Sequence, residues 1–168
     1  MLEIFYPDHE VKDAYGIDYE GLYKKGFRGV IFDIDNTLVP HGAPADERAV
    51  ALFVRLHGIG FRTVLLSNNK EPRVKMFNDG VRSEYIFKAG KPGREGYKRA
   101  MKLMGTAPEN TMFVGDQLFT DIWGAKKAGI VTWLVRPIHP KEEIQIVLKR
   151  RLERIVLFFY HRKGRKPV

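Results

Sequence analysis

Cysteine is absent from this 168-residue sequence. A disulfide framework, a thiolate zinc site and a cysteine nucleophile are therefore excluded, and the composition fits a reducing compartment. The sequence also lacks a run of 18 apolar residues, so we expect no helix that crosses a bilayer. Residues 1–4 show no basic region followed by an apolar block, so we expect no secretion signal and a cytoplasmic location.

Acidic residues are scarce only near the C-terminus. The net charge is +9, of which residues 1–135 contribute +2 and residues 136–168 contribute +7. A basic tail on a nearly neutral body indicates that the tail binds a polyanion while the body carries a separate function. With 44% hydrophobic residues, we expect one domain over residues 1–168, with a catalytic core at 25–136 and a basic helix and tail at 137–168.

Short apolar runs alternate with segments of helical spacing along the core. The runs are five or six residues long and rich in β-branched and aromatic types, which is typical of strands buried on both faces. This alternation predicts an α/β, Rossmann-like parallel sheet of about five strands. Residues 1–25 show no clear pattern, and we expect an irregular lead-in with one short helix at 19–24. The predicted strands are 29–33, 62–67, 85–89, 111–116 and 130–135, and the predicted helices are 45–57, 92–105 and 118–128.

Polar residues follow the predicted strands, where ligands bind in open α/β sheets. Asp33 and Asp35 come directly after the first strand of the core and can point to the same side. Two close carboxylates repel unless a cation compensates, and Mg²⁺ prefers oxygen ligands. Asp116 follows another strand and supplies a third carboxylate, while Lys91 could neutralise a phosphoryl group. The set suits phosphoryl transfer, in which one aspartate is the nucleophile and the other moves protons.

Four segments together resemble the motifs of the haloacid-dehalogenase-like (HAD-like) phosphatases, in that family's order. They are Asp33-Ile-Asp35-Asn-Thr37-Leu, Leu66-Ser67-Asn68-Asn69, Lys91-Pro92 and Gly115-Asp116-Gln-Leu-Phe-Thr-Asp121. The resemblance implies a HAD-like fold and an Mg²⁺-dependent phosphomonoesterase. Asn36 stands where many members of the family have glycine.

The resemblance also implies a role for each matching residue. Asp33 would be the nucleophile and a metal ligand, and Asp35 would be the general acid and base, with its backbone carbonyl on the metal. Lys91 would complete the catalytic set, and Asp116 would bind the metal. Thr37, Ser67 and Asn68 would contact the substrate, and Asp121 would support Lys91 or the metal's water shell. Arg73 could reach a substrate phosphate, but a solvated helix face is favoured, and His41 has no assigned partner.

Neither gap between the motifs is long enough for a cap domain. Asp33 is 34 residues from Ser67, which is 24 residues from Lys91, and strand, loop and helix use most of the first gap. We therefore expect an open site, which excludes water poorly unless a large substrate or a second copy covers it.

The basic C-terminal segment has its own pattern. From Ile144 on, six apolar positions recur at helical spacing and predict an amphipathic helix. Two roles stay open for this helix: binding to an anionic membrane surface, or packing its apolar positions on the domain or on a twin chain. The six positions are Ile144, Leu148, Leu152, Ile155, Val156 and Phe159.

Nearly the whole chain resembles a narrower family, the capless bacterial phosphatases similar to the mitochondrial phosphatidylglycerophosphate phosphatase. The resemblance rests on residues 33–39, 67–69 with Arg73-Val74, 89–92, 115–121 and 151–154. It implies removal of the terminal phosphate from the head group of phosphatidylglycerophosphate, a phospholipid, to give phosphatidylglycerol. The basic amphipathic helix adds the expectation of a peripheral location at the inner face of a membrane. The alternatives are a cytosolic phosphatase of sugar phosphates or nucleotides, acting as a homo-oligomer, and a protein whose tail binds nucleic acid.

Overall fold

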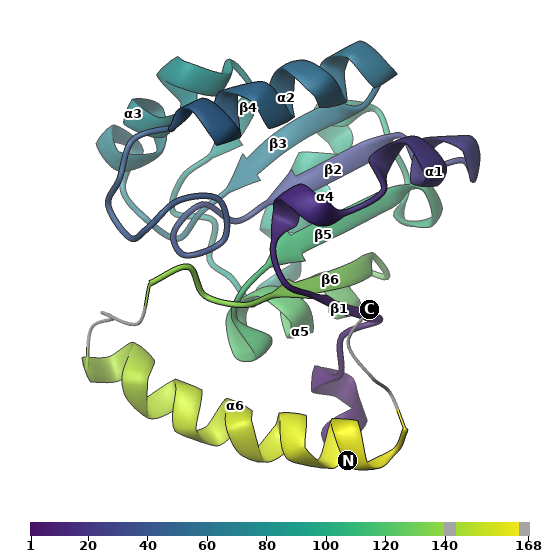
Figure 1. The fold of residues 1–168 in the computed structure, drawn as a ribbon, viewed down its shortest axis with the longest axis vertical. Helices are drawn as coiled ribbons and strands as arrows, with labels where there is room; N and C mark the ends of the chain where they lie inside the picture. The colour runs from purple at the N-terminus through teal and green to yellow at the C-terminus, as the bar shows by residue number, and fades with distance from the viewer. Residues whose placement is uncertain (140–143, 165–168) are drawn as a thin grey trace.

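The computed structural model describes residues 1–139 and 144–164 and contains a parallel sheet of six strands (Figure 1). The predicted α/β class is confirmed, with one strand more than expected. The strand order is β1-β6-β5-β2-β3-β4, and every pairing between neighbouring strands is parallel. The strands are β1 (His9–Val11), β2 (Gly29–Phe32), β3 (Arg62–Leu66), β4 (Glu84–Ile86), β5 (Thr111–Gly115) and β6 (Val131–Val135).

Two elements were missing from the prediction. β1 arises in the segment expected to be irregular, because its three residues pair with β6 at the sheet edge and carry no pattern of their own. Helix α3 was missing as a bounded element: Arg73 was placed on a helix face, but no helix was predicted over 71–81, although Val74, Phe77 and Val81 are buried at helical spacing. The helices are α1 (Tyr19–Lys24), α2 (Glu47–Ile59), α3 (Glu71–Val81), α4 (Arg94–Met104), α5 (Trp123–Lys127) and α6 (Ile144–Arg162). A π-helical turn at Leu118–Ile122 precedes α5.

Helices cover both faces of the sheet because successive strand residues point to opposite sides. Val30 and Phe32 of β2 belong to a core cluster with residues of α1, α2 and α3. Ile31, between them, belongs to a second cluster with residues of α4 and α5. β2 is buried throughout, as expected for a central parallel strand.

The chain order reverses beside β2. From β2 the chain proceeds to β3 and β4 on one side, while β5, β6 and β1 lie on the other. In such sheets the crevice beyond the carboxyl ends of the strands is the ligand site. The residues directly after β2, β3 and β5 therefore meet at one place.

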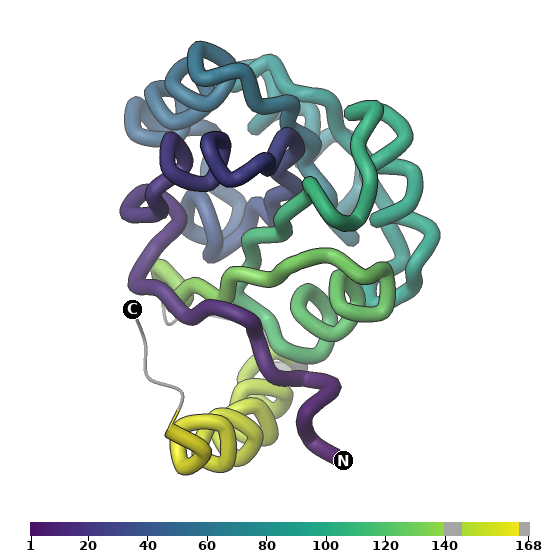
Figure 2. The backbone as a smooth tube through the Cα atoms, turned by 90° about the vertical axis from the view of Figure 1, so that its right-hand side faces the viewer, coloured from purple at the N-terminus to yellow at the C-terminus, as the bar shows by residue number. Residues whose placement is uncertain are grey.

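Helix α6 lies below the edge of the sheet, beside the N-terminal segment (Figures 1 and 2). Val156 and Tyr160 of α6 are buried against Tyr6 and the turn after β5. Leu148, Leu152, Ile155 and Phe159, called here the exposed stripe, face solvent. Of the two roles left open for these positions, packing on the domain is seen for Val156, whereas the exposed stripe does not pack on this chain. None of the described helices is long and apolar enough to cross a membrane.

Candidate active site

The loop after β2 places two expected site residues. Asp33 follows the strand, and its amide donates to the carbonyl of Val114, so it continues the pairing of β2 with β5. Asn36 adopts a positive φ of 61°. Glycine and asparagine tolerate this conformation best, which explains the asparagine at this position. The turn brings Thr37 back towards Asp33.

Thr37 lies between the carboxylates of Asp33 and Asp116. Its Oγ1 is 3.3 Å from Oδ2 of Asp33 and 3.2 Å from Oδ1 of Asp116, and all three residues are buried. A hydroxyl carries one proton and can serve only one of these oxygens at a time. Two carboxylates thus face each other across a neutral group.

Lys91 connects two aspartates at the same place. Its Nζ donates to Oδ1 of Asp33 and to Oδ1 of Asp121, at 2.6 Å each. The Lys91 side chain is only 3% exposed, so a solvated loop lysine is excluded. The other oxygen of Asp121 accepts hydrogen bonds from the amides of Asp116 and Gln117. Asp121 therefore fixes both Lys91 and the loop that carries Asp116.

Asp35 is held from the opposite side. Asn69 donates to its Oδ2 at 2.7 Å, and Arg73 and the amide of Gly42 both donate to its Oδ1 at 2.8 Å. Arg73 is thus not on a solvated helix face, because helix α3 directs it to Asp35. His41, which had no assigned partner, lies with Nδ1 3.9 Å from the same carboxylate.

Ser67 and Asn68 follow β3 and line the catalytic pocket, which has a volume of about 220 Å³. Ser67 Oγ accepts from the amide of Asn69, so this hydroxyl orders its own turn as well as facing the pocket. Asn68 binds the backbone of Lys91 twice, accepting from its N–H and donating to its carbonyl. The amide of Asn68 is thereby committed to positioning Lys91.

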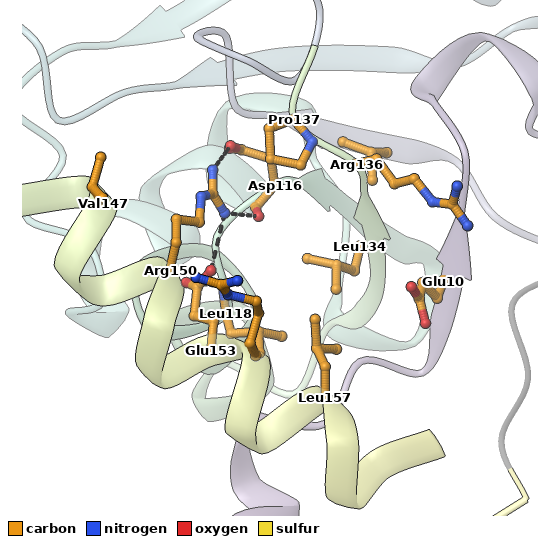
Figure 3. Close-up of a pocket in the computed structure, with 12 residues that line it drawn as sticks. Glu10, Asp116, Leu118, Leu134, Arg136, Pro137, Val147, Arg150, Glu153 and Leu157 are labelled. Atoms are coloured by element: carbon orange, nitrogen blue, oxygen red, sulfur yellow. Dashed lines mark hydrogen bonds and ion pairs between the residues drawn. The ribbon is translucent and has the colours of Figure 1, made fainter. Parts of the chain in front are cut away.

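Helix α6 contributes residues that the sequence analysis did not assign to the site. Ile146 and Lys149 line the catalytic pocket, so α6 supplies part of the wall that no cap insertion provides. Arg150 reaches the carboxylate and the carbonyl of Asp116, and it also donates to Glu153 (Figure 3). Glu153 in turn accepts from the amide of Leu118. The sequence contained one indication of this contact. Arg150 and Glu153 lie outside the apolar positions of the predicted amphipathic helix.

Burial and charge shift the pKa values of the central groups. Burial raises the pKa of Asp33 to about 6, although Lys91 lowers it. Burial, followed by the charge of Asp33, raises the pKa of Asp116 well above its usual range. Burial alone would lower the pKa of Lys91, but Asp121 and Asp33 outweigh it and hold the ammonium in its charged form.

The donor set fits a divalent cation. Asp33, Asp116 and Asp121 each offer an oxygen within 4.8 Å of the others, and all three are buried. Lys91 and Arg150 contact these three carboxylates, and Arg150 also binds Glu153, so two cations face four carboxylates and two negative charges are in excess. Because Asp121 is already bound by Lys91 and two amides, the oxygens beside Thr37 on Asp33 and Asp116 are the ones suited to Mg²⁺.

Comparison with known proteins agrees with this geometry. Residues 88–143 match a family described as HAD-hydrolase-like. The chain is 35% identical to "Probable phosphatase YqeG" of Bacillus subtilis, over 98% of this chain and 96% of that protein. This chain belongs to the HAD-like phosphatases. It is an enzyme of the phosphoric monoester hydrolase class, as the four motifs predicted.

A second relative of this HAD-like phosphatase has a more specific name. The chain is 32% identical to phosphatidylglycerophosphate phosphatase 1, chloroplastic/mitochondrial, of Arabidopsis thaliana, over 96% of this chain but only 50% of that protein. Among solved structures, a HAD family hydrolase from Deinococcus radiodurans has a TM-score of 0.56 at 17% identity, covering 74% of this chain and 88% of its own. At that identity the likeness concerns the fold alone.

Proposed function

We propose that this protein is an Mg²⁺-dependent phosphomonoesterase that removes the terminal phosphate of phosphatidylglycerophosphate. The observation that carries the catalytic part is the pair of facing carboxylates, Asp33 and Asp116, with Lys91 bound to Asp33 at 2.6 Å. When bound, Mg²⁺ supplies positive charge that brings the substrate phosphoryl oxygens and the carboxylates together.

The chain's own residues divide the reaction between them. Asp33 attacks phosphorus, and a P–O bond to its carboxylate forms as the bond to the leaving alkoxide breaks. Asp35 donates a proton to that alkoxide, then takes one from the water that hydrolyses the aspartyl phosphate. Lys91 holds Asp33 in place and faces the transferred charge, while Ser67 and Thr37 donate to phosphoryl oxygens. Asn69 and Arg73 orient Asp35 throughout.

The lipid substrate is supported by helix α6 and by the Arabidopsis relative's name. Leu148 and Leu152 in the exposed stripe are 63% and 54% exposed, and Phe158 beside it is also exposed. Basic residues flank these positions and contribute to the +7 charge of residues 136–168. Each cation near an anionic bilayer is worth about 1 kcal/mol. We therefore propose a peripheral position at the inner face of a membrane, with α6 as the contact.

Catalysis is tested with the full chain on a generic phosphate ester, with and without Mg²⁺. Asp33→Asn and Asp35→Asn are expected to lose turnover, and chelation of the metal is expected to abolish the wild-type rate until Mg²⁺ is restored. Turnover by Asp33→Asn at the wild-type rate contradicts the mechanism. The substrate is tested in parallel on phosphatidylglycerophosphate, sugar phosphates, nucleotides and 3′-phosphorylated DNA, and preference for another member of this panel contradicts the lipid assignment.

Membrane contact is tested by co-sedimentation with vesicles that contain anionic lipid. Leu152→Ser in the exposed stripe is expected to reduce the sedimented fraction, whereas Val54→Ser on α2, another exposed apolar position, is the matched control. Sedimentation that is equal for the two variants removes α6 from the proposal.

The division of the chain into a core at 25–136 and a basic helix and tail at 137–168 stays a prediction.

A further inference from the structure

A second cavity lies beside the catalytic pocket, between α6 and the ends of β5 and β6 (Figure 3). Its volume of about 460 Å³ falls in the range of small-molecule sites. We call it the α6 groove. Its apolar wall consists of Leu118, Leu134, Val135, Pro137, Val147 and Leu157.

The α6 groove borders the catalytic edge of the sheet. Asp116 lines the groove and also contacts Thr37 in the catalytic set. Neighbouring residues of α6 line the two cavities: Ile146 and Lys149 line the catalytic pocket, while Val147 and Arg150 line the groove. A ligand bound in the groove therefore lies beside Asp116, a member of the catalytic set.

The chemistry of the groove selects an amphiphile. Its wall is apolar, so the hydroxyl-rich body of a sugar phosphate or the base of a nucleotide would lose hydrogen bonds there without replacement. Three carboxylates also line the groove, but Arg150 binds those of Asp116 and Glu153, and His161 contacts Glu10. Two exposed arginines on the lining, Arg136 and Arg154, match an anionic group. An apolar chain joined to a phosphodiester satisfies both features.

The groove and the exposed stripe occupy different sides of the same helix. Successive residues of a helix are about 100° apart, so Val147 lies about a quarter-turn from Leu148, and Arg154 about a quarter-turn from Ile155. Val147 and Arg154 line the groove, whereas Leu148 and Ile155 face solvent. An acyl chain leaving a bilayer at the exposed stripe thus has a short path into the groove.

We infer that the α6 groove binds an acyl chain of a phosphorylated lipid, with the phosphodiester at the arginines and the terminal phosphomonoester at Asp33. This inference rests on the proposed function and adds to it the site that recognises the lipid body. The groove makes the acylated substrate preferable to its bare head group.

The test compares soluble, short-chain phosphatidylglycerophosphate below its micelle concentration with the deacylated head group, using the full chain and Mg²⁺. In wild type the acylated form is expected to have a KM at least about tenfold lower, because its chains leave water. Val147→Trp fills the groove and is expected to erase that advantage while leaving the head-group rate unchanged. Val147 is 41% exposed, so the larger side chain is compatible with folding.

Leu148→Trp is the matched control, since it makes the same substitution at the neighbouring position, on the exposed stripe. It is expected to retain the wild-type preference. Leu157→Trp, with its fold checked by thermal unfolding, gives a second filled groove. Equal KM values for the two substrates in wild type, or an acyl preference that survives in Val147→Trp, overturn the inference.

Calorimetric titration with short-chain phosphatidylglycerol separates the inference from the proposed function. Wild type that hydrolyses neither lipid-derived substrate, but turns over another phosphate ester, refutes the proposed function. In that case saturable binding of phosphatidylglycerol that Val147→Trp abolishes still supports the groove, and no binding overturns it. Size-exclusion chromatography completes the test. A change of elution volume caused by Val147→Trp, without a change in phosphatidylglycerol affinity, assigns the groove to a second copy of the chain and also overturns the inference.

Discussion

Replacing Lys91 by methionine is the sharpest test of the buried charge arrangement. The ammonium is 3% exposed and donates to Asp33 and Asp121 at 2.6 Å each, so its removal leaves two buried carboxylates without their shared cation. Breaking a buried pair in this way costs about 3–5 kcal/mol. The free energy of unfolding of a chain of this size is typically about 5–15 kcal/mol. Lys91→Met is therefore expected to fold, with a melting temperature lowered by about 6–20 °C.

The assay is denaturant unfolding at neutral pH and at a pH of about 5, without metal. Without Lys91, the pKa of Asp33 rises beyond the value of about 6 that burial already imposes. A carboxyl whose pKa is higher in the folded state destabilises the fold when it is ionised, and this penalty fades as the pH falls towards the unfolded value. The deficit of Lys91→Met against wild type is therefore expected to shrink at the lower pH.

Two variants complete the test of this reasoning. Lys98→Met, on the exposed face of α4, removes a lysine whose partner Glu95 is also exposed and is expected to change stability by less than about 0.5 kcal/mol. Asp121→Asn added to Lys91→Met removes one of the orphaned charges and is expected to recover part of the loss. A Lys91→Met protein as stable as Lys98→Met would refute the assignment of a structural charge to Lys91.

Three further outcomes follow from the site. Mg²⁺ affinity measured by calorimetry is expected to fall as the pH is lowered, because burial raises the pKa values of both Asp33 and Asp116 and a protonated carboxyl cannot bind the metal; a constant affinity contradicts this. Arg73→Met is expected to lower kcat with little change of KM, because Asp35 loses the side chain that orients it, while Arg73→Lys restores part of kcat; an unchanged kcat refutes a positioning role. Glu153→Ala is expected to lower the free energy of unfolding by about 1–3 kcal/mol and to speed amide hydrogen exchange in α6, because the Leu118 amide loses its acceptor. Unaltered exchange contradicts the role of Glu153 in holding α6 on the domain.

The core elements were predictable where local pattern and burial agree. β2 and β5 are short apolar runs that end at Asp33 and Asp116, and the structure places both at the centre of the sheet. Helix α1 falls at Tyr19–Lys24, where a short helix was expected. β1 could not be predicted, because its three residues become a strand only through pairing with β6. The role of the exposed stripe stayed open for a related reason: an apolar periodicity identifies a helix face but not the surface that covers it.

The candidate active site was also predictable only in part. The types and order of Asp33, Asp35, Lys91 and Asp116 were enough to predict phosphoryl transfer, because few chemistries need three carboxylates and an ammonium at successive strand ends. That Asn68 is occupied with the Lys91 backbone could not be predicted, since the contact joins loops 23 residues apart.

The sequence by itself determined the strand–helix alternation, the family and the acidic and basic groups that meet beyond the sheet. These follow from short-range periodicity and from the rule that parallel strands bring their carboxyl ends to one edge. Tertiary structure alone decided that Arg73 binds Asp35, that Arg150 reaches Asp116, and that the buried face of α6 is the one carrying Glu153 and Val156. Those outcomes depend on how a helix is rotated and docked, and on the cost of burying a charge without a partner, which no local pattern encodes.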